Sequence, residues 1–329
     1  MQTLTQLEAL SQRYINNSLA PSTVRGYTAA LRTYRYFCCG HNLSAFPVSE
    51  RTLLLFATHI SSYSSYTNIK KHMAAIKHFS VVSGLTTRFQ DFERLYLLIR
   101  GIRRAQGTAH SVPQRRPITP AMLRVIRRNL FNSTRFHEDK IMIWAAITTA
   151  FFGFLRVSEY TSPHKSKFDP HVTLLVEDID LDASSAKLLV KASKTDPFRE
   201  GMHIRIAAND TDLCPIHALH RFLPHHPTRR GPLFAFRDGK FLTASDVNKI
   251  LSATTHGAAS ISSHSLRIGA ASTAAAMGCP KWLIQGMGRW TSDCFRRYIR
   301  ISDDTIRTTS KSLATCSVPV PNDLRLHDD

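Results

Sequence analysis

The residues of this chain that could carry out chemistry gather in its last third, in the segment 263–300. They combine imidazole, guanidinium, indole and phenol groups, in the order His264, Arg267, Arg289, Trp290 and Tyr298. A guanidinium binds anionic oxygens through paired hydrogen bonds, an imidazole transfers protons near neutral pH, and a phenol oxygen acts as a nucleophile. This combination indicates chemistry on a substrate that carries negatively charged oxygens.

Two more candidates stand upstream, and most of these residues also have a structural interpretation. Arg156 lies in Gly-Phe-Leu-Arg-Val-Ser-Glu at 153–159, and Lys194 lies in Ser-Lys-Thr at 193–195. Arg156 and Glu159 are three residues apart and would form an ion pair worth about 0.2–0.5 kcal/mol on a helix. His-x-x-Arg alone is a common string, and a tyrosine near a helix end usually serves packing. The joint occurrence of these residues in this order is what makes the pattern specific.

The charge of the chain favours a polyanionic partner. Its 329 residues carry 43 Lys and Arg against 24 Asp and Glu, a net charge of +19, and the isoelectric point is about 10.1. Residues 1–107 hold 13 basic and 4 acidic side chains, and residues 108–329 hold 30 and 20. This balance excludes a typical acidic metabolic enzyme. Because both parts are basic, we expect both to contact the same phosphate backbone.

The first hundred residues are expected to be all helical. One apolar stripe at helical spacing runs from Val24 to Phe37 after a helix start at 22–23, and a second runs from Ile69 to Phe79 in a helix over 66–82. Basic residues occupy the other faces of the two helices: Arg25, Arg32, Arg35, Lys70, Lys71 and Lys77. One such face is usually solvated surface, but two in one small basic domain predict contacts with a DNA backbone.

A linker is expected at 108–117, because the segment 105–117 contains Gly, Ser and Pro and lacks periodicity. Four arginines near it are candidate phosphate contacts or, as a weaker alternative, a nuclear-import signal: Arg103, Arg104, Arg115 and Arg116. We therefore predict a helical DNA-binding domain at 1–107, a second domain at 118–316 that ends in a C-terminal helix, and a loose tail at 317–329.

The second domain is expected to be mostly helical, with a small three-stranded antiparallel sheet. One helix is expected to begin at 119–120. Apolar periodicity predicts further helices at about 138–154, 215–223, 243–256, 264–277, 280–287, 291–299 and 303–314. Short β-type runs at 172–176, 186–191 and 202–206 predict the strands. The longest apolar run, 141–155, is too short to cross a bilayer and indicates a buried helix.

Other function classes lack their motifs. The sequence holds neither a GxxxxGK[ST] phosphate loop nor a dinucleotide-binding GxGxxG. Cysteines and histidines occur together at 38–41 and 214–226, but neither group has a second ligand pair, so a metal site is a minor alternative. The first residues show no secretory-signal pattern and the six cysteines form no CxxC pair, so we expect a reduced intracellular compartment.

Together these motifs resemble the tyrosine recombinase (phage-integrase-like) family. The C-terminal string GRWTSDCFRRYIR is most similar to the eukaryotic mobile-element branch, the Crypton and DIRS/Ngaro-like recombinases. The resemblance covers nearly the whole chain. It implies a helical SAM-like core-binding domain followed by an α-rich catalytic domain with a small three-stranded sheet.

The resemblance also implies a role for each candidate residue. Tyr298 would attack a DNA phosphodiester, forming a 3′-phosphotyrosyl link and leaving a 5′-hydroxyl. Arg156 and Arg267 would clamp the non-bridging oxygens, and His264 would be a general acid/base. Lys194, on a hairpin loop, would protonate the leaving 5′-oxygen. Because the link retains the energy of the phosphoester, rejoining needs no ATP. The resemblance implies neither a metal nor another cofactor.

One position departs from the usual family pattern. Most members carry a His or Trp nine residues before the nucleophile, where this chain has Arg289, and Trp290 follows at eight. The mobile-element branch shares this Gly-Arg-Trp pattern. We favour Trp290 as the donor to the phosphate, with Arg289 as a charged alternative. Trp290 could also serve only to pack the tyrosine segment.

The implied partners are double-stranded DNA and further copies of the chain. The family works as a homo-tetramer on two duplexes, so the C-terminal segment is expected to dock onto a neighbouring protomer. The resemblance implies a nuclear protein that does not bind membranes. Two other functions stay open: a DNA-binding protein without catalysis that derives from such an element, and a type IB topoisomerase. The complete set of candidate residues argues against the first.

Overall fold

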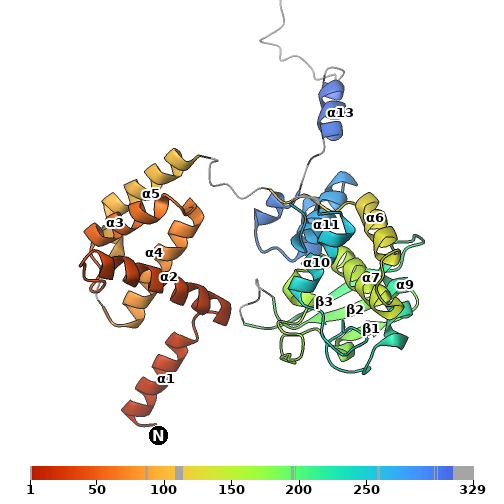
Figure 1. Cartoon of the computed structure of the whole chain (residues 1–329), viewed down its shortest axis with the longest axis horizontal. Helices are drawn as coiled ribbons and strands as arrows, with labels where there is room; N and C mark the ends of the chain where they lie inside the picture. The colour runs from red at the N-terminus through yellow and green to blue at the C-terminus, as the bar shows by residue number, and fades with distance from the viewer. Residues whose placement is uncertain are drawn as a thin grey trace, which may run out of the picture. The chain divides into compact units, whose positions relative to one another are not determined.

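The computed structural model describes residues 2–85, 88–107, 114–193, 196, 198–257, 260–299, 301 and 303–313, with only the backbone of Asp304 and Leu313. The chain divides into two compact units, residues 1–113 and 114–329 (Figure 1), and each has its own hydrophobic core. The division falls inside the predicted linker, whose residues 108–113 lie outside the described part. The fold is mainly helical with one three-stranded antiparallel sheet, which confirms the predicted fold class.

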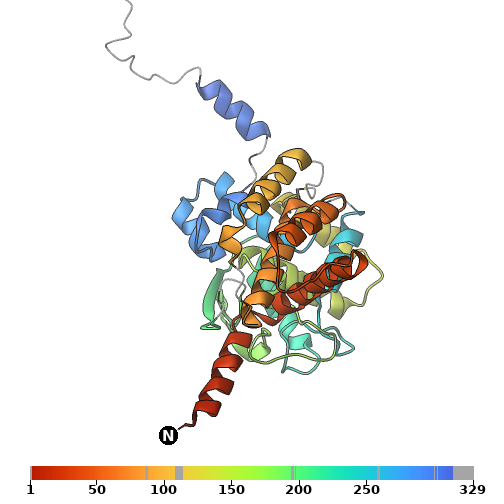
Figure 2. The same ribbon diagram turned by 90° about the vertical axis from the view of Figure 1, so that its left-hand side faces the viewer.

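The described residues of the first unit form helices only. These are α1 (Leu4–Asn16), α2 (Pro21–Gly40), α3 (Glu50–Ser61), α4 (Tyr66–Val82), the 3₁₀ turn η1 (Phe89–Asp91) and α5 (Glu93–Gln106). The hydroxyls of Ser49 and Ser65 cap α3 and α4 by accepting backbone N–H groups of their first turns. α2 packs against α4, and α3 packs against α5. In Figure 2 α1 extends away from these helices, and none of its residues is buried.

The two predicted apolar faces make the core of this unit. Leu31, Tyr34 and Phe37 of α2 are buried, as are Ile69 and Ile76 of α4. Tyr34 packs edge-on against Phe56 of α3, with ring centres 5.1 Å apart. Burial of these stripes holds the bundle together and leaves the basic faces of the same helices in solvent.

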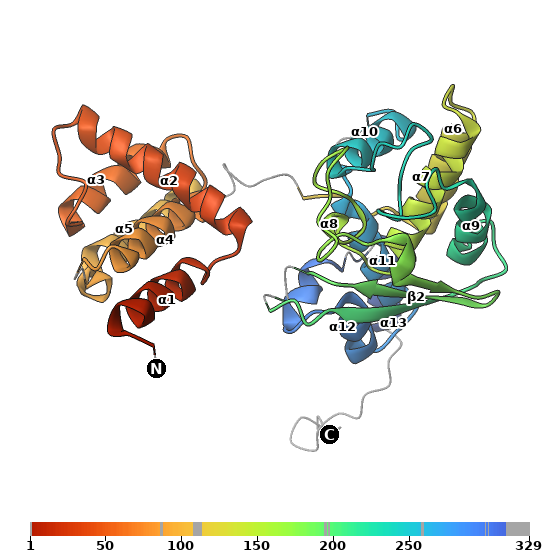
Figure 3. The same cartoon turned by 90° about the horizontal axis from the view of Figure 1, so that it is seen from below.

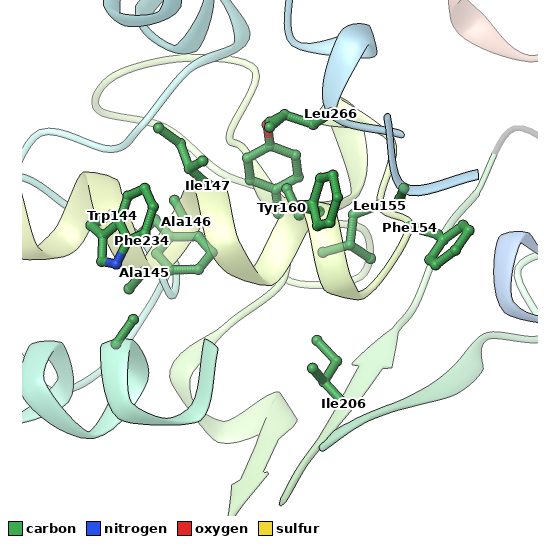
Figure 4. Packing of buried hydrophobic residues seen from close by; sticks show 14 of the residues in the cluster. Trp144, Ala145, Ala146, Ile147, Phe154, Leu155, Tyr160, Ile206, Phe234 and Leu266 are labelled. Atoms are coloured by element: carbon green, nitrogen blue, oxygen red, sulfur yellow. The ribbon is translucent and has the colours of Figure 1, made fainter. Parts of the chain in front are cut away.

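The second unit is built around one helix that is buried along most of its length. Its helical elements are α6 (Pro120–Phe131), α7 (His137–Phe152), α8 (Val157–Tyr160), η2 (Val176–Asp178), α9 (Pro215–Phe222), η3 (Leu223–His225), α10 (Ala244–Thr254), α11 (His264–Ala276), α12 (Lys281–Gly288), η4 (Asp293–Arg297) and α13 (Asp303–Leu313). In α7 all residues from Ile141 to Phe151 are buried, as the long apolar run predicts. Figure 4 shows Trp144 and Ile147 of this helix among the surrounding Tyr160, Phe234 and Leu266.

The predicted α-helix at 291–299 is wrong, because this segment forms a 3₁₀ helix instead. The chain there forms the short 3₁₀ element η4. The Ser292 side chain accepts the N–H of Cys294, and the N–H of Tyr298 bonds to the carbonyl of Phe295, the i to i+3 pattern of a 3₁₀ turn. This tighter turn packs Tyr298 against the core instead of continuing an α-helix.

The sheet consists of β1 (Ile179–Leu181), β2 (Ser185–Val190) and β3 (Met202–Ala207), has the order β1-β2-β3 and is antiparallel throughout. Figure 1 labels the three strands, and Figure 3 shows β2 from below. The predicted strands at 186–191 and 202–206 are confirmed. The predicted strand at 172–176 is wrong. Its residues Leu174 and Leu175 are buried, but they pair with the irregular segment 231–233, for example through the N–H of Leu233 and the carbonyl of Leu174. That apolar run fills the core without joining the sheet.

The predicted C-terminal helix at 303–314 is present as α13, and Ile306 on it is 52% exposed. The predicted tail at 317–329 lies outside the described residues. Within the described ranges, no helix combines the length and apolarity needed to span a membrane.

Candidate active site

The turn that carries Arg156 is shaped by the end of α7. Gly153 caps the helix, and a Cβ there would lie 2.8 Å from the carbonyl oxygen of Thr149, so a larger residue does not fit. Phe154 then adopts a left-handed φ of 50° and is buried. Arg156 follows as the N-terminal cap residue of α8. The string Gly-Phe-Leu-Arg is therefore a compact turn with the arginine at its end.

Glu159 lies at the centre of a charged network, and its side chain is fully buried. It accepts hydrogen bonds from Arg156 Nη1 at 2.8 Å, from the Arg156 backbone N–H at 2.9 Å, from Arg289 Nη2 at 2.6 Å and from the Ser193 hydroxyl at 2.9 Å. Burial alone would raise the pKa of this carboxyl. Arg289 and Arg156 outweigh that effect and hold its pKa below the ordinary 4.5. The Arg156–Glu159 ion pair, considered from the sequence, is thus one part of a larger network.

Arg267 is a charged residue with no exposed surface. Its Nη1 donates to the carbonyl oxygen of Phe154 and its Nη2 to that of Gly288, and its Cζ lies 4.4 Å from the ring centre of Trp290. Burial, followed by the proximity of Arg156 and Arg289, lowers the pKa of Arg267 to about 9, so it stays charged at neutral pH. Its Nε has no hydrogen-bond partner among the described residues.

The triplet Gly288-Arg289-Trp290 folds back on itself at the end of α12. Arg289 has a left-handed φ of 55°, and a Cβ on Gly288 would lie 1.7 Å from the Trp290 ring. Glycine is therefore required for the indole to lie over the backbone. The carbonyl that Gly288 presents to Arg267 belongs to the same turn.

The two candidates for the position before the nucleophile differ in their contacts. Besides Glu159, Arg289 donates to the carbonyls of Gly153 at 3.1 Å and Phe154 at 3.2 Å, so both its Nη atoms are engaged. Trp290 is only 4% exposed, and its Nε1 has no partner among the residues that the structure describes. In this geometry the guanidinium of Arg289 is held by the protein, whereas the buried indole N–H of Trp290 has no acceptor within the described structure.

Tyr298 lies beside the residues predicted to act with it. Its ring centre is 4.9 Å from that of Trp290 and 5.2 Å from that of His264, and Arg267 Cζ is 5.8 Å from the Tyr298 ring. The Ser272 hydroxyl of α11 donates to the Tyr298 carbonyl at 3.0 Å. The structure thus brings His264, Arg267, Trp290 and Tyr298 together. Arg156 joins them through its network with Arg289, which shares the Phe154 carbonyl with Arg267.

The site carries more positive charge and more hydrogen-bond donors than it satisfies. Three guanidiniums, those of Arg156, Arg267 and Arg289, surround the single carboxylate of Glu159. In the described part of the chain, three buried N–H donors of this cluster lack acceptors: Arg267 Nε, Arg289 Nε and Trp290 Nε1. An unpaired buried donor costs about 1–3 kcal/mol. The excess positive charge favours an anion next to the phenol. The three donors are themselves buried, so they can bond to such an anion only if the site opens.

The β2–β3 loop contributes a residue that the sequence did not indicate. Lys194 lies outside the described residues. Its neighbour Ser193 accepts a hydrogen bond from Arg156 Nη1 at 2.7 Å and donates to Glu159. Lys191, the other lysine near this loop, forms a 2.6 Å ion pair with Asp178 and so has a structural partner.

The ten basic residues predicted to contact DNA are exposed. Two of them, Lys70 of α4 and Arg103 of α5, flank the ring of Tyr66, at 5.7 Å for Nζ and 5.3 Å for Cζ. The two helices therefore place part of the predicted surface together. The contacts with DNA themselves stay a prediction.

The cysteines and histidines that suggested a minor metal alternative have structural contacts. The Cys214 sulfur accepts the N–H of His217 at the start of α9. His226 is buried between the carbonyl of Pro232, 3.1 Å from Nε2, and the N–H of Arg229, 2.9 Å from Nδ1. Within the described ranges, no group of three or more His, Cys, Asp or Glu is placed to hold a metal ion.

The segment that enters the second unit lies directly on α11. The N–H of Arg116 donates to the carbonyl of Ser260 at 3.1 Å, and that of Ile118 to Ser265 at 3.0 Å. A Cβ on Gly269 would lie 1.9 Å from the Ile118 carbonyl oxygen. Glycine at this position therefore allows the entering strand to touch the helix that bears His264 and Arg267.

Comparison with known proteins gives one curated relative and many structural ones. No family model matches the chain. An integrase/recombinase xerD homolog of Selenomonas ruminantium is 22% identical over 234 residues, which are 70% of this chain and 63% of that protein. The chain thus aligns with less than two thirds of that relative's length.

Several solved structures that resemble this chain are integrases or recombinases bound to DNA. The Tn1549 transposon integrase in complex with circular intermediate DNA has a TM-score of 0.59 at 15% identity, covering 94% of this chain and 99% of that one. XerH bound to difH gives 0.58 at 14% identity, covering 94% and 84%. A lambda integrase dimer bound to a core site gives 0.55 at 14% identity, covering 91% and 77%. This chain has the tyrosine recombinase fold, and the sequence likeness supports the tyrosine recombinase/integrase family.

Proposed function

We propose that this chain is a tyrosine-type DNA recombinase that cleaves and rejoins duplex DNA through a covalent link to Tyr298. The observation that carries the proposal is the buried cluster of three guanidiniums around one carboxylate beside this tyrosine. A DNA phosphodiester would supply the missing negative charge and the missing acceptors. The structural relatives with this fold, which are complexes with DNA, support duplex DNA as the partner.

The proposed step is a transesterification. Tyr298 Oη attacks phosphorus, a tyrosyl P–O bond forms, and the bond to the 5′-oxygen breaks. The phenol gives its proton to a base, and the 5′-oxygen takes up a proton to leave as a hydroxyl. One phosphoester replaces another, so the reverse attack by a 5′-hydroxyl rejoins the strand. His264, whose ring lies beside that of Tyr298, is the proposed acid/base. Lys194 is the proposed acid for the 5′-oxygen.

The surrounding side chains act on the charge that develops on the phosphate oxygens. Arg156 and Arg267 are the proposed clamp, and the Trp290 N–H is the proposed additional donor, because it is buried and unpaired within the described structure. Arg289 acts through Glu159, which binds both Arg156 and Ser193. Fixing these groups before DNA binds avoids the cost of ordering them during the reaction.

Covalent trapping tests this function. The full chain is incubated with a library of randomised duplexes that carry a nick, so that cleavage releases a short fragment and blocks rejoining. We expect SDS-resistant protein–DNA adducts with the wild type and none with Tyr298→Phe, which keeps the ring but lacks the nucleophile. Adducts that persist in the phenylalanine variant would refute Tyr298 as the nucleophile. Binding without adducts on sites that the protein prefers would favour the non-catalytic alternative.

The other alternative is a type IB topoisomerase, which shares the chemistry. Relaxation of any supercoiled plasmid without a specific site would favour it. Recombination between two copies of the site recovered from the adducts would favour the recombinase.

The finer proposals rest on the resemblance of the Gly-Arg-Trp to Tyr298 segment. They are a mobile-element origin of the Crypton or DIRS/Ngaro type, a nuclear location, and a homo-tetramer on two duplexes. The segment that contains α13 is proposed to dock onto a neighbouring protomer. Deletion of residues 301–329 is expected to reduce assembly on DNA in gel-shift or light-scattering measurements, and unchanged assembly would refute the docking.

A further inference from the structure

Phe198 is presented to solvent in the loop between β2 and β3. Its side chain is 84% exposed, although a phenyl ring gains free energy by leaving water. Other partly exposed phenylalanines of this unit have partners: Arg237 stacks 3.9 Å over the ring of Phe136, and Phe168 lies edge-on to Phe241 at 5.4 Å. In the described part of the chain, no ring or guanidinium stacks on Phe198.

The backbone around Phe198 has a defined shape. The Asp196 carboxylate accepts the N–H groups of Glu200 at 3.1 Å and Gly201 at 2.9 Å, on the far side of Phe198. Arg199 and Gly201 both have left-handed φ angles, 59° and 73°, which turn the chain back toward β3. These contacts tie Asp196 to the residues that follow Phe198, so the exposed ring stands between two bonded parts of the loop.

The same turn is anchored at the candidate active site. The Ser193 hydroxyl bonds both Arg156 and Glu159, and the Asp196 N–H donates to the Ser193 carbonyl at 3.1 Å. Phe198 is two residues beyond Asp196, so its Cα lies at most about 7 Å further along the chain. A phosphate held by Arg156 would therefore have this ring within a few base pairs, since B-DNA rises about 3.4 Å per base pair.

We propose that Phe198 is a wedge that stacks on a base or enters a base step next to the cleaved phosphate. This inference rests on the proposed recombinase function and adds a residue to it. Apolar side chains that enter base steps unstack them and kink the duplex, and an aromatic ring that stacks on a base compensates for the lost base stacking. Opening the step in this way gives Tyr298 an in-line approach to the phosphorus and lets the cut strand leave.

DNA is a better occupant for this ring than a protein surface. The loop contains Arg199 directly after Phe198, and its first part is bonded to the arginine proposed to bind the phosphate. The net charge of +19 favours a polyanion near this site.

The test measures adduct formation on the nicked duplex recovered by trapping, with the wild type, Phe198→Ala and Phe198→Trp. We expect the alanine variant to form adducts about 10- to 100-fold more slowly, which is ~1.4–2.8 kcal/mol at 1.4 kcal/mol per tenfold. The tryptophan variant should keep most of the rate. Phe136→Ala is the control, because it removes another exposed phenyl ring of the same unit, at the start of α7.

A second substrate separates a wedge from a merely structural residue. Mispaired bases at the cleaved step remove the need to unstack it, so this duplex should restore the rate of Phe198→Ala to within a few-fold of the wild type. A 2-aminopurine at the step should brighten on wild-type binding and stay quenched with the alanine variant.

The possible failures are distinguishable. Equal rates for wild type and Phe198→Ala would overturn the wedge and leave the recombinase intact. A loss that mispairing does not restore would also overturn the wedge, and with reduced assembly on DNA it would assign Phe198 to a contact with a second copy. Absence of wild-type adducts on every substrate would overturn the proposed function and the wedge with it.

Discussion

Replacing Glu159 by glutamine tests whether one carboxylate holds the arginine cluster together. The change keeps the size of the side chain but leaves three neighbouring guanidiniums without their counter-charge. Removing one partner of a buried ion pair typically costs about 3–5 kcal/mol. Because glutamine still accepts one hydrogen bond and Arg156 is partly exposed, we expect the lower end, about 3 kcal/mol. For a unit of this size that loss lowers the melting temperature by about 6–12 °C.

The assay is urea unfolding of the full chain, monitored by tryptophan fluorescence. All three tryptophans, Trp144, Trp282 and Trp290, lie in the second unit, so the signal reports that unit alone. Glu177→Gln is the matched control, because Glu177 is exposed and loses the same charge. Inorganic phosphate should stabilise Glu159→Gln more than the wild type, because an anion replaces the lost carboxylate. If Glu159→Gln unfolds within about 0.5 kcal/mol of the control, the cluster does not need this charge, and the reasoning is refuted.

Three further outcomes follow from the same contacts. Folding lowers the pKa of Glu159, so its stabilising contribution is present above its ordinary pKa of 4.5 and is lost as the pH falls through the lower pKa of the folded chain. The unfolding free energies of the wild type and Glu159→Gln should therefore converge on acidification. Trp290→Phe removes the unpaired N–H and should slow adduct formation about tenfold or more. Near-UV circular dichroism should show that the unit still folds. An unchanged rate would make Trp290 a packing residue only. Gly288→Ala should displace the Trp290 ring, lower the unfolding free energy by about 2 kcal/mol and abolish adducts, whereas Gly286→Ala, with nothing within 4 Å of the added carbon, should do neither.

Much of the fold follows from periodicity that is visible in the sequence. The stripes of α2 and α4 and the buried run of α7 are long enough to fix element type and core face. The errors fall on short segments. The apolar run at 172–176 is as compatible with irregular core packing as with a strand, and the turn before Tyr298 is set by contacts with Trp290 and α11.

The candidate site shows a similar limit. Residue types and order indicate His264, Arg267 and Tyr298, but no spacing reveals that Arg289 bonds to Glu159, 130 residues earlier. Ser193 gave no signal beyond its place beside Lys194. Gly288 belongs to the Gly-Arg-Trp motif, but the sequence does not reveal that the Trp290 ring lies over its backbone. Long-range pairs of this kind depend on tertiary packing, which local patterns do not encode.

The docking of residues 116–118 on α11 bears on how modular this protein is. A chimaera that exchanges the first unit needs a junction between the two units, and the predicted linker would allow one anywhere up to residue 117. The hydrogen bonds of Arg116 to Ser260 and Ile118 to Ser265 show that the last part of this stretch already belongs to the second unit. A chimaera joined ahead of Gln114 keeps residues 116–118 on the helix of His264 and Arg267. One joined at Ile118 keeps only the Ile118 bond and replaces the residues that lead to it, so its second unit should be less stable.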